Sequence, residues 1–115
     1  MEALEIRVVT ADARLKKALL ERFARGGFAL ADSDGTFEEL ERGNLVVTTP
    51  ADCSPVAAKT LTRAGVIVVV LAPVTREQER AAYAQVGARY VPMAMDTGPL
   101  FDALRETVAG MRAAG

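Results

Sequence analysis

The sequence predicts a three-layer α/β domain in which helices cover both faces of a five-stranded parallel sheet. The main observation is the run from Val66 to Ala72, in which all seven residues are apolar and five are β-branched. Because this run shows no polar alternation, it is expected to be a central strand that is buried on both faces. Strand-like and helix-like stretches alternate along the whole chain, with strands beginning near residues 5, 28, 44, 66 and 88. This alternation favours a doubly wound sheet with the strand order 2-1-3-4-5.

The first β–α unit has clear boundary signals. Leu4 to Thr10 is predicted to be a strand, and Asp12 then stands where a helix N-cap belongs. The helix that follows has Leu19 and Phe23 at helical spacing on its buried face. Gly26-Gly27 is expected to end this helix in the left-handed conformation that glycine adopts easily.

The second unit is shorter and leads into the third strand. Phe28 to Ala31 is predicted to be a short strand, and Thr36 to Arg42 a short helix that ends at Gly43. Leu45 to Thr49 is the third predicted strand, and Pro50 stops it.

The helix after the third strand begins with two strong signals, because Ser54 is a preferred N-cap and Pro55 a preferred first helical residue. Val56, Ala57, Leu61 and Ala64 are expected to line its buried face, and Gly65 closes it. The central strand follows.

The last two helices flank the fifth strand. Thr75 is expected to cap a helix that ends at Gly87, and Arg89 to Met93 is the fifth predicted strand. Residues 96 to 99 begin a final helix, whose buried face is predicted to consist of Leu100, Phe101, Leu104, Val108 and Met111.

Length and composition limit the class of protein. The 115 residues suit one domain, residues 1–115, and 50% of them are apolar, which argues against disorder. The net charge of −1 argues against general binding to nucleic acid or to an anionic membrane. One cysteine and no evident signal peptide favour the cytoplasm. With no histidine in the chain, catalysis and metal binding by histidine are excluded.

Several of these segments together resemble the receiver (CheY-like) domain of bacterial response regulators, which has a flavodoxin-like fold. The resemblance covers nearly the whole chain and is carried by the opening from Ile6 to Asp12 and by the central strand. A further match is Gly87-Ala88-Arg89-Tyr90-Val91, which is similar to the G-A-x-x-Y-[LV] run of the family, shortened by one residue. Asp96, followed by Leu100 and Leu104, matches the usual start of the last helix.

The resemblance also implies which phosphotransfer residues are absent. In this family an aspartate after the third strand accepts a phosphoryl group, while an acidic pair, a Thr or Ser and a lysine support it through Mg²⁺ binding and charge neutralisation. The corresponding positions of this chain are Thr10 and Ala11 for the acidic pair, Thr49 (or Thr48) for the acceptor, Leu71 for the hydroxyl and Met93 for the lysine. A threonine hydroxyl cannot form an acyl phosphate. The chain is therefore expected to be a pseudo-receiver with no catalytic residues, no metal and no cofactor.

The loops after the first and third strands contain the other candidate residues, at the edge of the sheet where α/β domains bind ligands. The candidate crevice consists of Asp12, Thr48, Asp52, Cys53 and Ser54. The two acids suit either residual cation binding or helix capping, and capping is the simpler interpretation. The hydroxyls and the helix N-terminus suit either an anion or ordinary capping. Cys53 precedes a helix, but no base accompanies it for nucleophilic chemistry.

The resemblance further implies a partner surface on the helix after the central strand, the fifth strand and the last helix. Its candidate residues are Arg76, Arg80, Arg89, Tyr90 and Arg105. The functional expectation is a non-enzymatic module of bacterial signal transduction (two-component systems) that binds proteins, including a second copy of itself, with no direct contact to nucleic acid or membrane. A small-molecule or anion sensor that uses the crevice is the alternative, and a cysteine-based enzyme or phosphocarrier is a third option.

Overall fold

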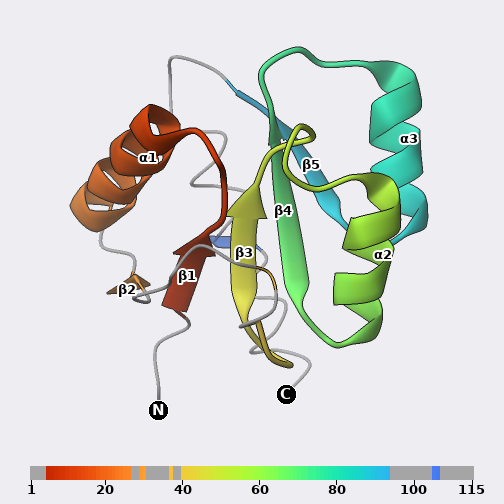
Figure 1. Cartoon of the computed structure of the whole chain (residues 1–115), viewed down its shortest axis with the longest axis horizontal. Coiled ribbons are helices and arrows are strands. Elements are labelled where there is room, and N and C mark those ends of the chain that lie inside the picture. Colours follow the sequence, from red (N-terminus) through yellow and green to blue (C-terminus); the bar gives the residue numbers. More distant parts are fainter. Residues whose placement is uncertain (1–4, 27–28, 31–36, 38–39, 94–104, 107–115) are drawn as a thin grey trace.

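The computed structural model describes residues 5–26, 29–30, 37, 40–93 and 105–106 (Figure 1). The elements in chain order are β1 (Glu5–Val8), α1 (Ala13–Arg25), β2 (Ala29–Leu30), β3 (Leu45–Thr48), α2 (Pro55–Arg63), β4 (Ile67–Ala72), α3 (Glu77–Gln85) and β5 (Arg89–Pro92).

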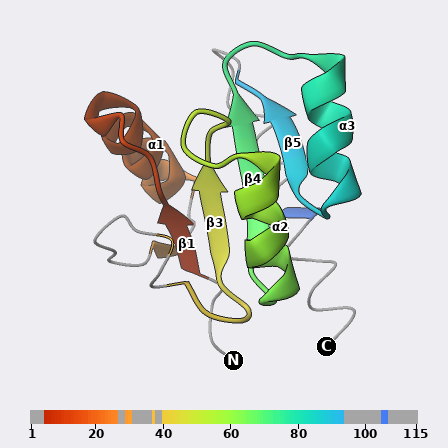
Figure 2. The same cartoon turned by 45° about the vertical axis from the view of Figure 1, so that its right-hand side comes forward.

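The five strands form one parallel sheet with the order β2-β1-β3-β4-β5, as the sequence predicts. Figures 1 and 2 show α1 on one face of this sheet and α2 and α3 on the other. In β4, every residue after Ile67 is buried, which confirms the prediction of a central strand covered on both faces. Because all the strands run the same way, the loops after β1, β3 and β4 meet at one edge of the sheet.

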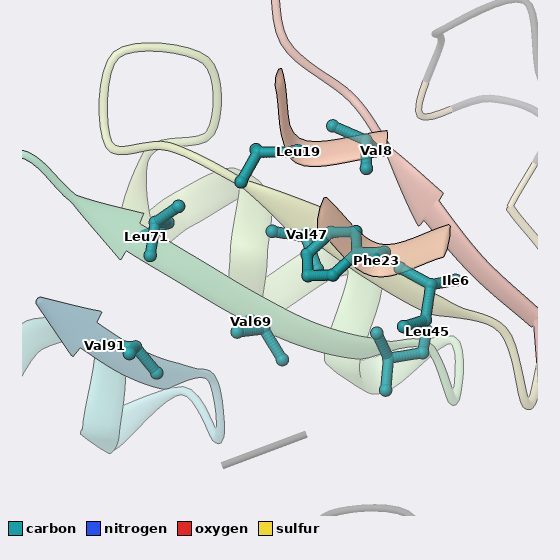
Figure 3. Packing of buried hydrophobic residues seen from close by; sticks show 9 residues of the cluster. All are labelled: Ile6, Val8, Leu19, Phe23, Leu45, Val47, Val69, Leu71 and Val91. Carbon is teal, nitrogen blue, oxygen red and sulfur yellow. The ribbon is translucent and has the colours of Figure 1, made fainter. Parts of the chain in front are cut away.

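Two hydrophobic clusters form the core, one on each face of the sheet. Leu19 and Phe23 of α1 pack among side chains of β1, β3 and β4 on the first face, as Figure 3 shows. On the second face, Ala58 of α2 and Tyr83 of α3 pack against the opposite side of the same strands. Alternate residues of β3 divide between the clusters, with Val47 in the first and Val46 in the second.

Several boundary predictions need correction. α1 ends at Gly26, as the sequence predicts, but Gly26 itself is right-handed with φ −76°. Gly27, the other glycine of the predicted left-handed cap, lies outside the described residues. The glycines after the later elements do adopt positive φ, with +88° at Gly65 and +82° at Gly87. A Cβ at Gly65 would also lie 2.8 Å from Cγ of Arg42, so this position requires glycine for space as well as conformation.

The buried face of α2 differs from the predicted one. Val56 is 77% exposed and the C-cap Ala64 is also exposed, whereas Ala58 is buried and Leu61 is partly buried. The cap at Ser54 fixes where the helix begins, and this register turns Val56 away from the side that faces the sheet.

Thr75 does not cap α3, because the helix begins one residue later and its N-cap is Arg76, without a side-chain cap hydrogen bond. Within the predicted short helix, Phe37 has 3₁₀ geometry, whereas residues 40 to 42 are not helical. Thr36, Glu38 and Glu39 lie outside the described residues. So do Phe28 and Ala31 at the ends of the second predicted strand, and the final helix except for Arg105 and Glu106, which are helical.

Candidate functional site

The loops after β1, β3 and β4 surround an open pocket of about 430 Å³ at the carboxyl edge of the sheet. Its walls are Thr10, Ala11, Asp12, Leu15, Thr49, Pro50, Ala51, Asp52, Pro73, Val74, Arg76 and Glu79. This is the edge at which parallel α/β sheets bind ligands, and the pocket is the candidate functional site.

Asp52 is the central polar group of the pocket. One of its carboxylate oxygens accepts a hydrogen bond of 2.8 Å from the backbone N–H of Ala11, which connects the loop after β3 to the loop after β1. The other oxygen accepts a hydrogen bond of 2.5 Å from the hydroxyl of Thr49. The hydroxyl of Thr10 accepts a hydrogen bond of 3.2 Å from the N–H of Asp12. The side chain at one receiver-like position, Thr49, thus donates to a carboxylate from within the same chain.

These contacts decide the charge state of Asp52. Partial burial raises the pKa of the carboxyl group. The polar contacts with Thr10, Thr49 and the N–H of Ala11 together lower the pKa by a larger amount, so the net pKa is below its ordinary value. Asp52 is therefore an ionised carboxylate at neutral pH. Its two carboxylate oxygens accept hydrogen bonds from the N–H of Ala11 and the hydroxyl of Thr49.

Two of the candidate crevice residues cap helices. The carboxylate of Asp12 accepts hydrogen bonds of 3.1 Å from the N–H groups of Arg14 and Leu15 at the start of α1. The hydroxyl of Ser54 accepts from the N–H of Ala57 at 3.2 Å, with Pro55 in the first turn of α2. Both caps are the ones that the sequence predicts, and Asp12 also lines the pocket.

Thr48 and Cys53 lie outside the pocket. Thr48 is 1% exposed and donates its hydroxyl to the carbonyl oxygen of Val9 at 2.7 Å, which holds β3 against the end of β1. Cys53 is fully buried in the cluster beneath α2 and α3. Burial, together with the nearby charge of Asp52, raises the pKa of the Cys53 thiol to about 11. A thiol with such a pKa is protonated at neutral pH and is a poor nucleophile.

Apolar side chains occupy the two remaining receiver-like positions. Leu71 is 2% exposed and belongs to the cluster beneath α1. Met93 packs against the same cluster, and its N–H donates to the carbonyl oxygen of Ala72 at 2.7 Å. This part of the sheet edge therefore contributes packing, whereas the expected hydroxyl and ammonium groups would contribute charge neutralisation.

The far wall of the pocket depends on Tyr90, which extends from β5. Its hydroxyl donates to the Glu79 carboxylate at 2.6 Å and accepts from the N–H of Arg76 at 3.3 Å, so Tyr90 contacts both the N-cap residue and the first turn of α3. The ring stacks on Tyr83 with 5.8 Å between centroids, and the Arg80 guanidinium lies 5.9 Å from its centroid. Burial, with the hydrogen bond to Glu79 next in size, raises the pKa of Tyr90.

The predicted partner surface is divided in the structure. Arg76, Arg80 and Tyr90 come together at the start of α3, where Arg76 also lines the pocket. Arg89 lies apart from them and forms an exposed ion pair of 3.4 Å with Glu106, next to Arg105.

Sequence reasoning did not assign Pro73, Val74 and Glu79 to the pocket. Their signal was present, because all three follow the carboxyl end of the central strand, within the loop and first turn that come after it. Within the described part of the chain, no three acidic or cysteine side chains gather closely enough to hold a metal ion. None of the described helices is long and apolar enough to cross a membrane.

No protein-family model and no curated protein matches this chain. A solved structure that it is similar to is the crystal structure of a response regulator from Thermotoga maritima. The two share 14% sequence identity with a TM-score of 0.76, over 94% of this chain and 99% of that chain. The chain therefore has the fold of a response-regulator receiver domain, and the predicted resemblance is confirmed at the level of the fold.

Proposed function

We propose that this chain is a receiver-like signalling module that accepts no phosphoryl group and acts through surface contact with a protein partner. The observation that carries this proposal is the Asp52 carboxylate, which accepts hydrogen bonds from Ala11 in the loop after β1 and from Thr49 in the loop after β3. In a phosphorylated receiver, a cation and a modified aspartate connect these loops. Here the unmodified side chain of Asp52 connects them.

The physical argument concerns charge and nucleophilicity. Phosphoryl transfer to a carboxylate needs nearby positive charge to stabilise the transferring group. In the described part of the chain, no three acidic side chains gather closely enough to hold a metal ion, and the pocket lining contributes the single guanidinium of Arg76. Asp52 would also have to give up the hydrogen bonds from Thr49 and Ala11 to attack phosphorus. Both requirements oppose phosphorylation and support a role through binding.

A protein partner is supported by the fold and by exposed side chains near the pocket. The surface around Arg76, Arg80 and Tyr90 combines guanidinium groups with a half-buried aromatic ring, and such residues are common at the centres of protein interfaces. If Asp52 holds the loops in one conformation, this surface is presented at all times. Signalling would then depend on the concentration of the partner rather than on a shift between two conformations of the domain.

The direct test is incubation with Mg²⁺ and acetyl phosphate, followed by intact-mass measurement under acidic conditions. We expect no added phosphoryl group. The sharp control is Asp52→Asn, because Asp52 is the carboxylate that could replace the absent acceptor. A stoichiometric phosphoryl adduct that disappears in Asp52→Asn would overturn the proposal and would identify Asp52 as a displaced acceptor.

A second candidate function is the binding of a small molecule in the pocket, which its volume of about 430 Å³ supports. Proline, valine and alanine side chains provide apolar walls, and Arg76 provides a charged group for orientation. Thermal-shift screening of a metabolite library tests this function, because a ligand that binds only the native state raises its melting temperature. A true pocket ligand loses most of its shift in Val74→Asp.

A further inference from the structure

The outer face of α1 carries an uneven share of the positive charge of the chain. Five of the 14 Lys and Arg residues lie on this helix, with one of the 15 acidic residues. The rest of the chain therefore holds nine basic and 14 acidic residues, a clear excess of negative charge. The basic residues of α1 are Arg14, Lys16, Lys17, Arg22 and Arg25.

Exposure and spacing arrange these charges on one side of the helix. Leu19 and Phe23 face the sheet, so the opposite side of α1 carries Arg14, Lys17 and Arg25, all of which are exposed. Figure 1 shows α1 as the outermost element on its side of the described sheet. Among the described residues, no carboxylate lies within ion-pair distance of these three cations. The positive charge is thus available to a partner.

Glu21 interrupts the row of cations. It is exposed and lies on the same side as Lys17 and Arg25, four residues from each. A nucleic-acid backbone or an anionic membrane presents negative charge at every point and would be repelled at this position. A folded protein surface can instead place a basic group opposite Glu21 and acidic groups opposite its neighbours, which is charge complementarity of the kind that selects protein partners.

We propose that the outer face of α1 docks an acidic helix of a partner protein, in which a basic residue pairs with Glu21. The helix is a suitable partner element because the charged row of α1 extends along 13 residues, about 20 Å, and a second helix packed alongside offers charges at matching intervals. The arginines contribute planar, bidentate contacts to carboxylates. This inference rests on the proposed function only in taking the partner to be a protein, and it does not depend on the state of Asp52.

The test uses two synthetic helical peptides of about 14 residues with glutamates along one face. One has a central lysine and the other a central glutamate. We expect the central-lysine peptide to bind wild-type protein more tightly by about tenfold in fluorescence anisotropy, because the other peptide places like charges together. In the charge-swap variant Glu21→Lys, this preference is expected to reverse.

Two double variants, each of which replaces two basic residues by glutamate, test whether the peptide binds at α1. Arg14→Glu with Lys17→Glu is expected to weaken binding of the central-lysine peptide by about tenfold or more. Lys59→Glu with Arg63→Glu changes two exposed residues of α2, on the other face of the sheet, and is expected to leave binding unchanged within about twofold. Unchanged circular dichroism confirms that each variant is folded.

The outcomes separate this inference from its alternatives. Equal affinity for the two peptides, or equal losses in the two double variants, would overturn it as non-specific charge attraction. Tighter binding to duplex DNA or to vesicles of anionic lipid would overturn it in favour of a phosphate surface. Self-association that is lost in Arg14→Glu with Lys17→Glu would assign the face to a second copy of the chain. A phosphoryl adduct on Asp52 would overturn the proposed function and leave the α1 result intact.

Discussion

On the face of the sheet that α1 covers, the buried cluster is made of hydrocarbon side chains, from Ile6 of β1 to Val91 of β5 (Figure 3). On the face beneath α2 and α3, the buried cluster also contains the thiol of Cys53 and the phenol of Tyr83. The Tyr83 hydroxyl donates to the carbonyl oxygen of Cys53 at 2.5 Å, which joins α3 to the residue just before the α2 cap.

This difference determines how each face relates to the pocket. Hydrocarbon packing is non-directional, so the α1 face contributes stability without fixing the orientation of a polar group. The other face is connected by directional contacts, from Cys53 to Tyr83, from Tyr83 to the stacked ring of Tyr90, and from Tyr90 to Glu79. A change on this second face is therefore expected to reach the pocket, whereas a change on the first face mainly lowers stability.

The largest expected effect is that of Phe23→Ala on the hydrocarbon face. Phe23 is fully buried, and its removal is expected to lower the free energy of unfolding by about 3–5 kcal/mol. Urea denaturation measures this loss. A loss below about 1 kcal/mol would mean that α1 is loosely packed and would remove the contrast between the faces.

A smaller effect is expected for Tyr83→Phe on the other face. The variant keeps the ring but leaves the carbonyl oxygen of Cys53 without its hydroxyl donor, which is expected to cost about 1–2 kcal/mol. Hydrogen exchange is expected to accelerate in the loop before α2, even though the change is in α3. If exchange accelerated only within α3, the hydroxyl would not connect the two elements.

Tyr90→Phe is expected to have a lesser effect on stability, about 0.5–1 kcal/mol, because its hydroxyl is only partly buried. The effect that distinguishes this variant is a local change in amide hydrogen exchange. The amide of Arg76 loses its acceptor and is expected to exchange faster, while amides of α1 are unchanged. Uniform acceleration across both helices would contradict a specific role for Tyr90 at the start of α3.

The smallest effect at neutral pH comes from tyrosine ionisation, which becomes visible only in alkali. Burial, followed by the nearby groups Cys53, Glu79 and Tyr90, raises the pKa of Tyr83 to about 12. Because the folded state favours the neutral phenol, the associated stability is present below the unfolded pKa of about 10 and is lost as pH rises towards about 12. An ultraviolet phenolate titration should show ionisation above pH 10, accompanied by loss of stability. Ionisation of both tyrosines near the ordinary value, without unfolding, would contradict the buried contact.

Much of the fold was predictable because its signals are local. The apolar run of β4, the caps at Asp12 and Ser54 and the glycines at 65 and 87 each act within a few residues of their own position. The errors also have local causes. The start of α3 was misplaced because its N-cap, Arg76, is not a preferred capping residue and makes no side-chain cap hydrogen bond. Val56 was misassigned because its small helix has an ambiguous apolar face.

The location of the candidate site was predictable from the sequence, but the hydrogen bonds within it were not. The rule that ligands bind beyond the carboxyl ends of parallel strands led to Asp12 and Asp52, and both line the pocket. The same rule also included Thr48, whose hydroxyl instead faces Val9, because strand-end residues alternate in direction and the sequence alone does not set the last turn.

By itself, the sequence determined the order of strands and helices, the buried central strand and the uncharged residue types at the receiver-like positions, since these depend on periodicity and residue type. Tertiary structure decided which groups contact one another at the pocket. Asp52 meets the N–H of Ala11 across 41 residues, and Tyr90 meets that of Arg76 across 14. Such pairings depend on how parallel strands bring distant loops to one edge of the sheet, and no local pattern encodes them.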